Sequence, residues 1–467
     1  MITLGLDTGT SSIKALLIGF GNPCVFEKPY STSDTLKNAP GGLTCDRFIS
    51  AVKEILFDIN IYCNLENVES IGLSGQTGTY LTVSDITARE NIETSSIWLP
   101  WYEPGREQYL ERILNNFSSD QWIRSIAMVH PRLASYPLPA ILYLQDKYPG
   151  IFKTGTYLLQ PKDYLCGLFT GSFMSDTGSW RGLTNAVSGS FSEELLEYAG
   201  ITCDNLPIIS DRGQIDKKGA SLTGFKPGTP VAVGYNDFYS ALIGIGINKP
   251  GDCFDITGTS EHFGIMVKDR IDTTLIASPY MTGYVHYGVT ASSGKTLDVA
   301  RRLFGECDPE VPIHAPIFLP YLAGERMPVS DTDARGMMIG LNEHTDRDAM
   351  KYSMTEGVVF SLYDIYVSLG QPDIQQINCT GGASINPLLN RLKASIFNVP
   401  AVTDELTCGS ALGAVKSAGG YLDRKNIIIE PDLFLNEFLL SRFEIYKRMY
   451  SAWKEMTAGI DTVEIFG

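Results

Sequence analysis

Residues 5–15 read Gly-Leu-Asp-Thr-Gly-Thr-Ser-Ser-Ile-Lys-Ala, a turn of small hydroxyl residues between two apolar runs. The runs Ile2–Leu6 and Ile13–Ile18 are typical of β-strands, and a third run, Cys24–Phe26, follows Gly-Asn-Pro. The pattern predicts a three-stranded meander. Its first turn offers backbone N–H groups and hydroxyls, which are the donors that hold phosphate oxygens.

The Thr-Gly-Thr-Ser tetrapeptide of this turn, residues 8–11, occurs again at residues 257–260. The second copy also lies between strand-like runs, Cys253–Ile256 and His262–Val267. The shared setting favours duplication over chance, and it predicts two related α/β halves that face one another across a cleft. Asp7 precedes the first copy but an isoleucine precedes the second, so only one turn carries an acid.

The rest of the chain alternates strand-like and helix-like patterns, as expected of an α/β protein. Apolar runs predict strands at Val68–Leu73, Val231–Val233 and Ile374–Cys379. Apolar residues at helical spacing predict helices at Gly105–Asn115, Leu138–Tyr148, Ala349–Leu369 and Asn386–Phe397. We therefore predict an α/β fold with two duplicated domains, at residues 1–246 and 247–467.

The composition is that of an ordinary globular protein. The chain has 467 residues, 44% hydrophobic and 19% charged, and can bury a large core without disulfides. Thirty-seven basic and 53 acidic residues give a net charge of −16, which argues against nucleic-acid and anionic-membrane partners. An anionic small molecule stays compatible with this charge, because a nucleotide needs only a local cradle of N–H groups and a metal.

The cysteines and histidines are dispersed along the chain and lack the spacing of a zinc site. The nine cysteines form no CxxC pair and are odd in number, which is typical of free thiols in a reducing compartment. The first residues carry no basic segment and place Asp7 where a signal peptide would be apolar. These features predict a cytoplasmic protein.

Phosphoryl transfer from ATP requires phosphate donors, a metal and a base, and the first turn supplies candidates for two of these. Thr10, Ser11 and Ser12 offer hydroxyl and N–H donors, and Asp7 at a strand end can hold Mg2+. An ordinary Asp-x-Gly hairpin explains the same residues. The second Thr-Gly-Thr-Ser copy favours the phosphate interpretation.

A candidate base lies in Gly-Tyr-Asn-Asp-Phe, residues 234–238, after an apolar run. Asp237 can accept a proton from a hydroxyl, but it can also be the N-cap of a following helix, and spacing alone favours the cap. Residues 292–296, Ser-Ser-Gly-Lys-Thr, imitate a P-loop. We exclude that site because position 289 is Val where the motif requires Gly.

An aromatic cluster is a candidate sugar-binding segment. Trp98, Trp101 and Tyr102 precede Glu103 and Arg106. Aromatic faces stack on the C–H faces of sugars, and a carboxylate accepts from their hydroxyls. Buried aromatic packing explains the cluster equally well.

Seven ordered segments resemble the FGGY carbohydrate kinases, a family that includes xylulose, ribulose, gluconate, sedoheptulose and glycerol kinases. They read GLDTGTSSIKA from Gly5, GLSGQTGTY from Gly72, PKDYLCGLFTGSFMSD from Pro161, GTPVAVGYNDFYSALIGIG from Gly228, KPGDCFDITGTS from Lys249, FLPYLAGERMPVSDTDARGMMIGL from Phe318 and CTGGASINPLLNRLKA from Cys379. The resemblance implies two domains of the actin-like, ribonuclease-H-like ATPase fold, with ATP, Mg2+ and a small sugar in the intervening cleft. Dimers are common in that family, so a homodimer is an expectation.

The resemblance also implies roles for matching residues. Asp237 matches the catalytic base, which displaces the cap interpretation, and Asp7 matches the magnesium-associated aspartate. The implied nucleotide contacts are Thr10, Ser11, Ser12, Lys14, Gly258, Thr259, Gly382 and Asn386. The implied sugar contacts are Gln76, Thr77, Trp101 and Glu103, together with Asp237.

The segments implied to face the sugar depart from the family pattern. Thr77-Gly78 stands where xylulose kinases have Met-His, and Pro104 is an extra residue after Glu103. Phe238 follows the implied base, where many members have Asn or Gln. The phosphate-binding residues are retained, so the departures concern the identity of the sugar.

Two alternatives to a sugar kinase stay open. One is a non-catalytic sugar or nucleotide sensor, against which the retention of Asp7 and Asp237 argues. The other is an actin- or chaperone-like ATPase that works on protein partners, which the sugar-kinase segments disfavour. We expect ATP-dependent phosphorylation of a small sugar or polyol, a ketose such as xylulose, at a primary hydroxyl.

Overall fold

The computed structural model describes the chain except residues 31–43, 85–96, 129–132, 259, 271–273, 306–310, 312–313, 424 and 467. Contacts between Cα atoms divide it into two compact units. Unit 1 comprises Met1–Gly244 with Cys408–Leu422, and unit 2 comprises Ile245–Thr407 with Asp423–Gly467. Each unit is built on a mixed β-sheet covered by helices, so the predicted α/β class is confirmed.

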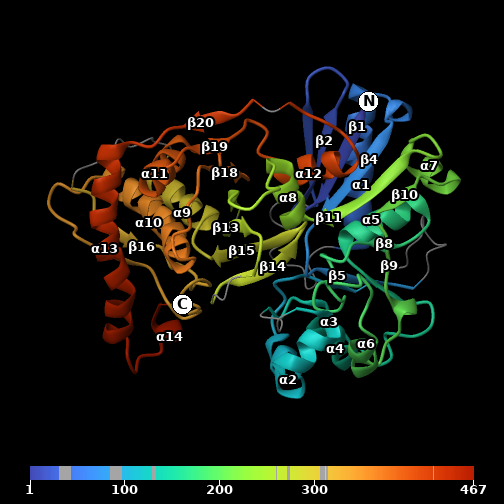
Figure 1. The fold of residues 1–467 in the computed structure, drawn as a ribbon, viewed down its shortest axis with the longest axis horizontal. Helices are drawn as coiled ribbons and strands as arrows, with labels where there is room; N and C mark the ends of the chain where they lie inside the picture. Colours follow the sequence, from blue (N-terminus) through green and yellow to red (C-terminus); the bar gives the residue numbers. More distant parts are fainter. Residues whose placement is uncertain are drawn as a thin grey trace. The chain divides into compact units, whose positions relative to one another are not determined.

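The sheet of unit 1 begins with the predicted meander. Its strands are β1 (Thr3–Thr8), β2 (Ser12–Ile18), β3 (Cys24–Pro29), β4 (Ser70–Gly75), β10 (Arg212–Gln214) and β11 (Pro230–Asn236). Their order is β10-β11-β4-β1-β2-β3, and Figure 1 labels the strands from β10 to β2. The strands β1, β2 and β3 pair antiparallel, whereas β4 runs parallel to both β1 and β11. The carboxyl ends of β1, β4 and β11 therefore lie at one edge of the sheet, where ligands bind in open α/β sheets.

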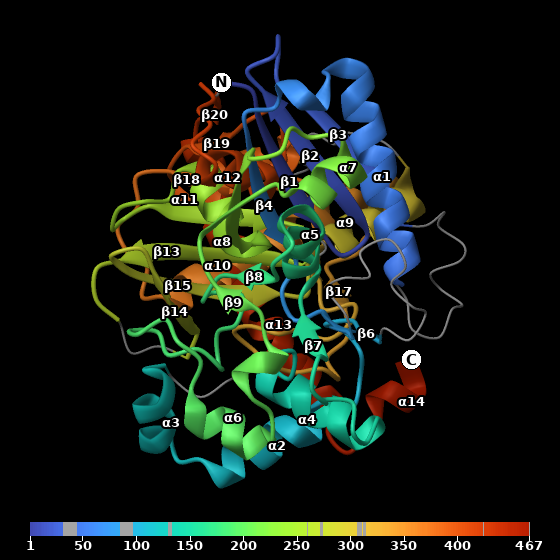
Figure 2. The same ribbon diagram turned by 90° about the vertical axis from the view of Figure 1, so that its right-hand side faces the viewer.

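The two faces of this sheet pack against different helices. One face carries Leu4 and Leu6, which share an apolar core with Phe48 of α1 (Cys45–Tyr62) and with α5 (Pro161–Thr170). Figure 2 shows α1 alongside β2 and β3. The opposite face carries Gly5 and Gly72, where a Cβ would lie 2.2 Å from the Ala411 carbonyl oxygen and 1.8 Å from that of Ala414.

Only glycine permits such an approach, so α12 (Gly409–Ser417) packs backbone to backbone on the sheet, although it lies far along the chain. Because side chains alternate along a strand, Asp7 points to the same face as Gly5. The carboxylate of Asp7 therefore lies on the α12 face of the sheet. The helix α12 in turn packs on α8 (Asp237–Ile245), since a Cβ at Gly413 would lie 1.8 Å from the Ser240 carbonyl oxygen.

The remainder of unit 1 includes a smaller helical part with its own core around Trp122 and Trp180, formed mainly by α2 (Glu107–Asn116), α3 (Ser119–Ile126), α4 (Pro137–Lys147) and α6 (Glu193–Ala199). The other elements of unit 1 are β5 (Tyr80–Val83), β6 (Trp98–Leu99), β7 (Tyr157–Leu159), β8 (Met174–Ser175), β9 (Ile208–Ile209), α7 (Lys217–Thr223), which packs on α5, and short 3-10 turns at Leu65–Asn67 and Cys203–Asn205. The helices predicted at Gly105–Asn115 and Leu138–Tyr148 are confirmed as α2 and α4.

Unit 2 repeats the strand order of unit 1. Its sheet contains β12 (Cys253–Thr257), β13 (Glu261–Val267), β14 (Ile276–Tyr280), β15 (Gly283–Thr290), β18 (Ile377–Thr380), β19 (Ala401–Thr403) and β20 (Ile427–Ile429). The order β15-β13-β12-β18-β19 corresponds to β3-β2-β1-β4-β11, with the same antiparallel and parallel pairings. The duplication inferred from two Thr-Gly-Thr-Ser turns thus extends to the topology of both sheets.

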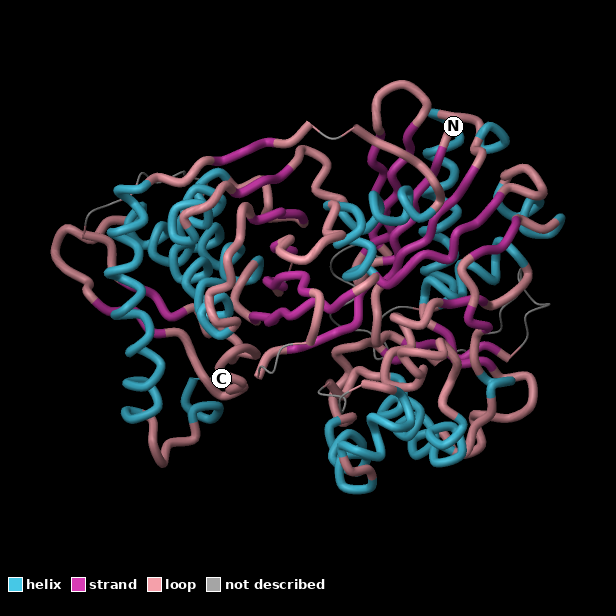
Figure 3. Tube along the Cα trace, in the orientation of Figure 1, coloured by secondary structure: helices cyan, strands magenta, loops and turns pink. Residues whose placement is uncertain are grey.

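Long helices cover the sheet of unit 2, as Figure 3 shows in cyan. They are α9 (Gly294–Phe304), α10 (Arg347–Ser368), α11 (Pro387–Phe397) and α13 (Leu433–Met456), with the short α14 (Thr462–Phe466) and the hairpin β16 (Ile317–Leu319) and β17 (Met337–Ile339). The helices predicted at Ala349–Leu369 and Asn386–Phe397 are confirmed. Within the described ranges, no helix is both long and apolar enough to cross a membrane.

Candidate active site

The first Thr-Gly-Thr-Ser turn, residues 8–11, is closed by its own backbone and held by two side chains from elsewhere in unit 1. Gly9 N donates to the Ser12 carbonyl at 3.0 Å. Gln76 Nε2 donates to the Gly9 carbonyl at 2.9 Å, and Trp101 Nε1 donates to Thr10 Oγ1 at 3.2 Å. Two implied sugar contacts, Gln76 and Trp101, thus lie directly against the implied nucleotide contacts of the turn.

Ser12 and Lys14 share a partner that the sequence analysis did not identify. Ser12 Oγ donates to Glu27 Oε1 at 2.6 Å, and Lys14 Nζ lies 3.7 Å from the same oxygen. Thr10 and Ser11 are exposed at the tip of the turn, whereas Ser12 is buried. Glu27 on β3 therefore fixes two residues of the implied phosphate site, a role visible only once β2 and β3 are paired.

Asp7 is buried at the end of β1. Ser74 Oγ, on the neighbouring strand, donates to Asp7 Oδ1 at 2.8 Å. Burial raises the pKa of Asp7, while the Ser74 hydroxyl and the charge of Lys14, its cross-strand partner, oppose that rise. The carboxylate is in a setting where a cation would strongly favour its ionised form.

Asp237 is the first residue of α8, but Asn236 makes the capping hydrogen bond. Asn236 Oδ1 accepts from Tyr239 N at 3.0 Å, while Asp237 Oδ1 accepts from the adjacent Phe238 N at 2.8 Å. Burial raises the pKa of Asp237 to about 7, and the nearby Asp7 carboxylate adds to the rise. The Phe238 N–H and the Arg181 guanidinium act in the opposite direction.

Asp7 and Asp237, the expected magnesium-associated acid and the expected base, lie close enough for the charge of Asp7 to raise the pKa of Asp237. Within the part of the chain that is described, no three His, Cys, Asp or Glu side chains cluster as a self-sufficient metal site. Mg2+ in nucleotide enzymes commonly uses only one or two carboxylates, with water and phosphate as its other ligands. Asp7 alone therefore fits a magnesium ion bound jointly with a nucleotide, and Asp237 stays available as a base.

The implied sugar-facing segments are tied together by polar contacts. Thr79 Oγ1 donates to Gln76 Oε1 at 2.9 Å and accepts from Trp101 N at 3.1 Å. Arg106, which is 1% exposed, donates to the carbonyls of Gly78 at 3.3 Å and Pro100 at 3.0 Å, and also to that of Trp101. Arg106 thus fixes the two segments to each other.

Among the other aromatic and polar candidates of these segments, one is buried in the core and the rest are exposed or partly exposed. Trp98 is buried and donates through Nε1 to Cys45 Sγ at 3.2 Å, so it is a packing residue. Tyr102 is exposed and stacks edge-on against Trp101, with ring centroids 5.4 Å apart. Thr77 and Glu103 are partly exposed.

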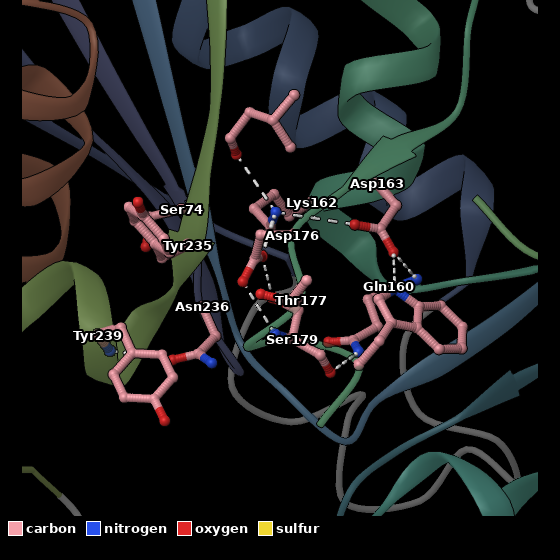
Figure 4. A network of polar contacts seen from close by, with 12 residues as sticks. Ser74, Gln160, Lys162, Asp163, Asp176, Thr177, Ser179, Tyr235, Asn236 and Tyr239 are labelled. Atoms are coloured by element: carbon pink, nitrogen blue, oxygen red, sulfur yellow. Dashed lines mark hydrogen bonds and ion pairs between the residues drawn. The ribbon is translucent and has the colours of Figure 1, made fainter. Parts of the chain in front are cut away.

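A buried ion-pair network contacts β11, the strand that directly precedes Asp237 (Figure 4). Lys162 Nζ donates to Asp176 Oδ2 at 2.8 Å and to the Val233 carbonyl at 3.2 Å. Asp176 Oδ1 accepts from Ser179 N at 2.9 Å, and Asp163 Oδ2 accepts from Trp180 Nε1 at 3.1 Å. The network joins α5, β11 and the loop after β8.

That loop carries Arg181, a further charged group of the site that the sequence did not point out. Its guanidinium lies over the Tyr136 ring at 5.4 Å and is close enough to Asp237 to lower the pKa of that carboxyl. Ser179–Ser192 contains no helix or strand. Nothing in its sequence indicated that it reaches Asp237.

The turn at Gly258, in the second Thr-Gly-Thr-Ser copy, is the corresponding feature of unit 2. Gly258 N donates to the Ser260 carbonyl at 2.9 Å, and Gly294 N, at the start of α9, donates to the Gly258 carbonyl at 3.2 Å. Thr259 lies outside the described residues. The excluded P-loop segment, residues 292–296, thus lies beside this turn as the beginning of an ordinary helix.

The two implied adenosine contacts follow β18. Gly382 is exposed, and Asn386 caps α11 by accepting from Leu389 N at 3.0 Å. The preceding Gly381 lies so close to the Gly258 turn that a Cβ would be 2.3 Å from the Thr257 carbonyl oxygen. Gly258, Gly382 and Asn386 therefore belong to one local region of unit 2.

Comparisons with known proteins give a consistent family. Residues 2–244 match the N-terminal domain of the FGGY family of carbohydrate kinases, and residues 256–419 match its C-terminal domain. The xylulose kinase of Lactococcus lactis is 23% identical over 500 residues, which cover 97% of this chain and 96% of that protein.

Solved structures of the same family superpose on the whole chain. The gluconate kinase of Lactobacillus acidophilus has a TM-score of 0.81 at 23% identity, covering 99% of both chains. The xylulose kinase of the same organism has the same TM-score and identity, covering 98% of this chain and 99% of its own. These likenesses establish the actin-like ATPase fold and leave the sugar open.

Proposed function

Because the chain belongs to the FGGY family of carbohydrate kinases, which phosphorylate sugars with ATP, we propose that it phosphorylates a small ketose such as xylulose at a primary hydroxyl. The observation that carries this proposal is the state of Asp237. Its carboxyl is not used as a helix cap, and its pKa is raised to about 7 beside Asp7. A general base works best when its pKa lies near the pH of the reaction.

In the proposed reaction, Asp237 accepts the proton of the sugar hydroxyl as that oxygen attacks the γ-phosphorus of ATP. The new O–P bond forms as the bond to the β-phosphate oxygen breaks, and ADP leaves. The N–H groups of the Gly9 turn, with Thr10 and Ser11 exposed at its tip, hold phosphate oxygens and so oppose their mutual repulsion.

Asp7 would hold Mg2+ together with the nucleotide, and a bound magnesium ion neutralises phosphate charge. Lys14, opposite Asp7 on β2, adds a fixed positive charge on the same side of the sheet. In unit 2, the Gly258 turn and the Gly382–Asn386 segment are the proposed contacts for the rest of the nucleotide. Each of these residues is implied by the family motifs that surround it.

The proposed sugar contacts are Gln76, Thr77, Trp101 and Glu103. Gln76 and Trp101 are held in place by Thr79 and Arg106, which suits a preorganised pocket. A ketose is preferred because a xylulose kinase is among the most similar full-length relatives. A gluconate kinase with an equal structural likeness makes aldonates the class to test alongside ketoses.

The test is ADP release by the purified protein with Mg2+ and ATP, against a panel of ketoses, aldonates and polyols. Release stimulated by xylulose or a related ketose supports the proposal. Stimulation by an aldonate or polyol alone retains a sugar kinase and overturns the ketose assignment. Sugar-independent hydrolysis supports an ATPase, and thermal stabilisation by sugar without turnover supports a sensor.

A further inference from the structure

A second buried ion-pair network lies directly under the Gly258 turn of unit 2. Its members are Asp255, Thr257, Glu261 and Lys393, none of which has exposed surface. Thr257 and Glu261 are the two residues that flank the turn, and they pair with each other across β12 and β13. Any movement of this network must therefore change the ends of the turn.

Lys393 is the centre of the network. Its Nζ donates to Asp255, to Glu261 Oε1 at 2.7 Å and to Thr257 Oγ1 at 3.2 Å, so all three of its N–H donors have partners. Thr257 Oγ1 lies 2.9 Å from Glu261 Oε1 and 3.2 Å from Asp255 Oδ2. One ammonium group thus joins both strands of the hairpin to α11.

The same helix carries the implied adenosine region. Lys393 lies on α11, whose N-cap is Asn386, and the preceding Gly381 packs on the Thr257 carbonyl. A single lysine therefore links the implied phosphate-binding turn to the implied adenosine-binding segment. This link lies wholly within unit 2, whereas the base and the metal-associated acid lie in unit 1.

The charges of the network do not balance unless it holds an extra proton. Two carboxylates and one ammonium carry a net charge of −1, which would oppose the binding of phosphates just above. Burial and the neighbouring Glu261 raise the pKa of Asp255 to about 8, against the opposing effect of Lys393. The other titratable groups that face Asp255 are the thiols of Cys253 and Cys379, whose pKa values burial also raises.

We propose that Lys393, Asp255 and Glu261 form a singly protonated clamp that positions the Gly258 turn, and that loss of its proton weakens nucleotide binding. The inference depends on the proposed function only in naming ATP as the ligand of this turn. The three residues are positioning residues, since they act through the turn and through α11.

The first test measures binding of a non-hydrolysable ATP analogue with Mg2+ by isothermal titration calorimetry at pH 7 and pH 9. One added negative charge beneath the turn should raise the Kd of wild-type protein about fivefold to tenfold between these pH values. Asp255→Asn, which keeps the shape and neutrality of the protonated acid, should bind like wild type at pH 7 and lose the extra pH dependence. An equal rise in both proteins would overturn the proposal.

Asp364→Asn is the matched control, because Asp364 is a buried carboxyl of unit 2 paired with Lys447 away from the turn. Its pH dependence should equal that of wild type. A flattened pH dependence of Kd in this control would show that the loss of any buried carboxyl has the same effect. That result would overturn the proposed clamp.

The second test uses Lys393→Met, which removes the ammonium and leaves two buried carboxylates. Combining it with Asp255→Asn leaves one buried carboxyl without a cation instead of two, so the double variant should still fold. The double variant should raise the KM for ATP about tenfold or more while changing the KM for the sugar less than twofold, through loss of the positioning lysine. Equal effects on both KM values would show a merely structural role.

Calorimetry needs no sugar and no turnover. A wild-type protein that phosphorylates nothing in the sugar panel would therefore overturn the proposed function while leaving the clamp to be judged by its Kd values.

Discussion

Asn236 Oδ1 accepts a hydrogen bond from Tyr239 N at 3.0 Å, so Asn236 caps α8 and the adjacent Asp237 does not. Of two neighbouring polar residues, one caps the helix and the other stays available for the proposed proton transfer. The cap fixes the start of α8, and the carboxyl of Asp237 is then aimed by the first turn of a rigid helix. The position of the proposed base therefore depends on the capping hydrogen bond of its neighbour.

This division predicts a specific effect of Asn236→Asp. Aspartate is an equally good cap, so the fold should be retained, but a third carboxylate beside Asp7 and Asp237 should raise the pKa of Asp237 further. The acid limb of kcat/KM for the sugar should move to higher pH by about one unit. Asn236→Ser, which caps without charge, is the control, and identical pH profiles for the two variants would contradict the prediction.

The pKa of Asp237 also predicts how stability varies with pH. Its folded-state pKa of about 7 lies above the ordinary value of 3.8, so the folded protein holds this proton more tightly than the unfolded chain. The free energy of unfolding should therefore fall as pH rises from about 4 to about 7, and then level off.

Asp237→Asn removes the free-energy cost of ionising this buried carboxyl, because asparagine is a neutral group of the same shape. At pH 8 it should raise the free energy of unfolding by about 2–4 kcal/mol, measured by urea denaturation, with little difference from wild type at pH 4. A variant less stable than wild type at pH 8 would show that Asp237 is ionised at no cost, against this account.

Arg106→Met tests the support of the sugar-facing segments. The guanidinium holds three backbone carbonyls while almost fully buried, so its loss should destabilise the protein by about 2–4 kcal/mol. The KM for the sugar should rise several-fold more than the KM for ATP, because Trp101 and Gly78 lose their common anchor. The exposed Arg112→Met is the control, and equal changes in both KM values would argue against local support.

Lys162→Met tests the network beneath the base. It leaves Asp176 and Asp163 without their cation, so it should lower the free energy of unfolding by about 3–5 kcal/mol at pH 8. Burial raises the pKa of Asp163 to about 6 although Lys162 lowers it, so removing Lys162 should raise that pKa further, and the loss should shrink as pH falls from 8 toward about 6. Adding Asp176→Asn should recover part of the stability, and no recovery would indicate that packing rather than charge is lost.

The fold could be predicted from the sequence because its repeating unit is local. Each Thr-Gly-Thr-Ser turn lies in a hairpin of adjacent strands, and the apolar runs around it have unambiguous strand or helix spacing. The return of α12 to unit 1 could not be predicted. It depends on backbone contact at Gly5 and Gly72, and glycines in a strand do not reveal what packs on them.

The candidate site could be predicted only in part, for a similar reason. Asp7, Thr10 and Asp237 lie in short motifs whose residue types match their chemistry. Glu27 and Arg181 come from segments without such motifs, and they reach the site through strand pairing and through an irregular loop. Arg106 is noted in the sequence only for its place after the aromatic cluster, and its contacts with three carbonyls depend on burial of a long side chain. Long-range contacts of this kind leave no periodic pattern in a single sequence.

The central claim is that Asp237 accepts the proton of the sugar hydroxyl. The most direct test is sugar-dependent ADP release by Asp237→Asn, with the panel sugar that stimulates wild type most, alongside the Kd for the non-hydrolysable ATP analogue. Asp211→Asn, an exposed carboxyl of the same unit, is the matched control. The account predicts that Asp237→Asn lowers the sugar-dependent rate at least about 100-fold while nucleotide affinity stays within about threefold, and that the control matches wild type. A rate for Asp237→Asn within threefold of wild type would contradict it.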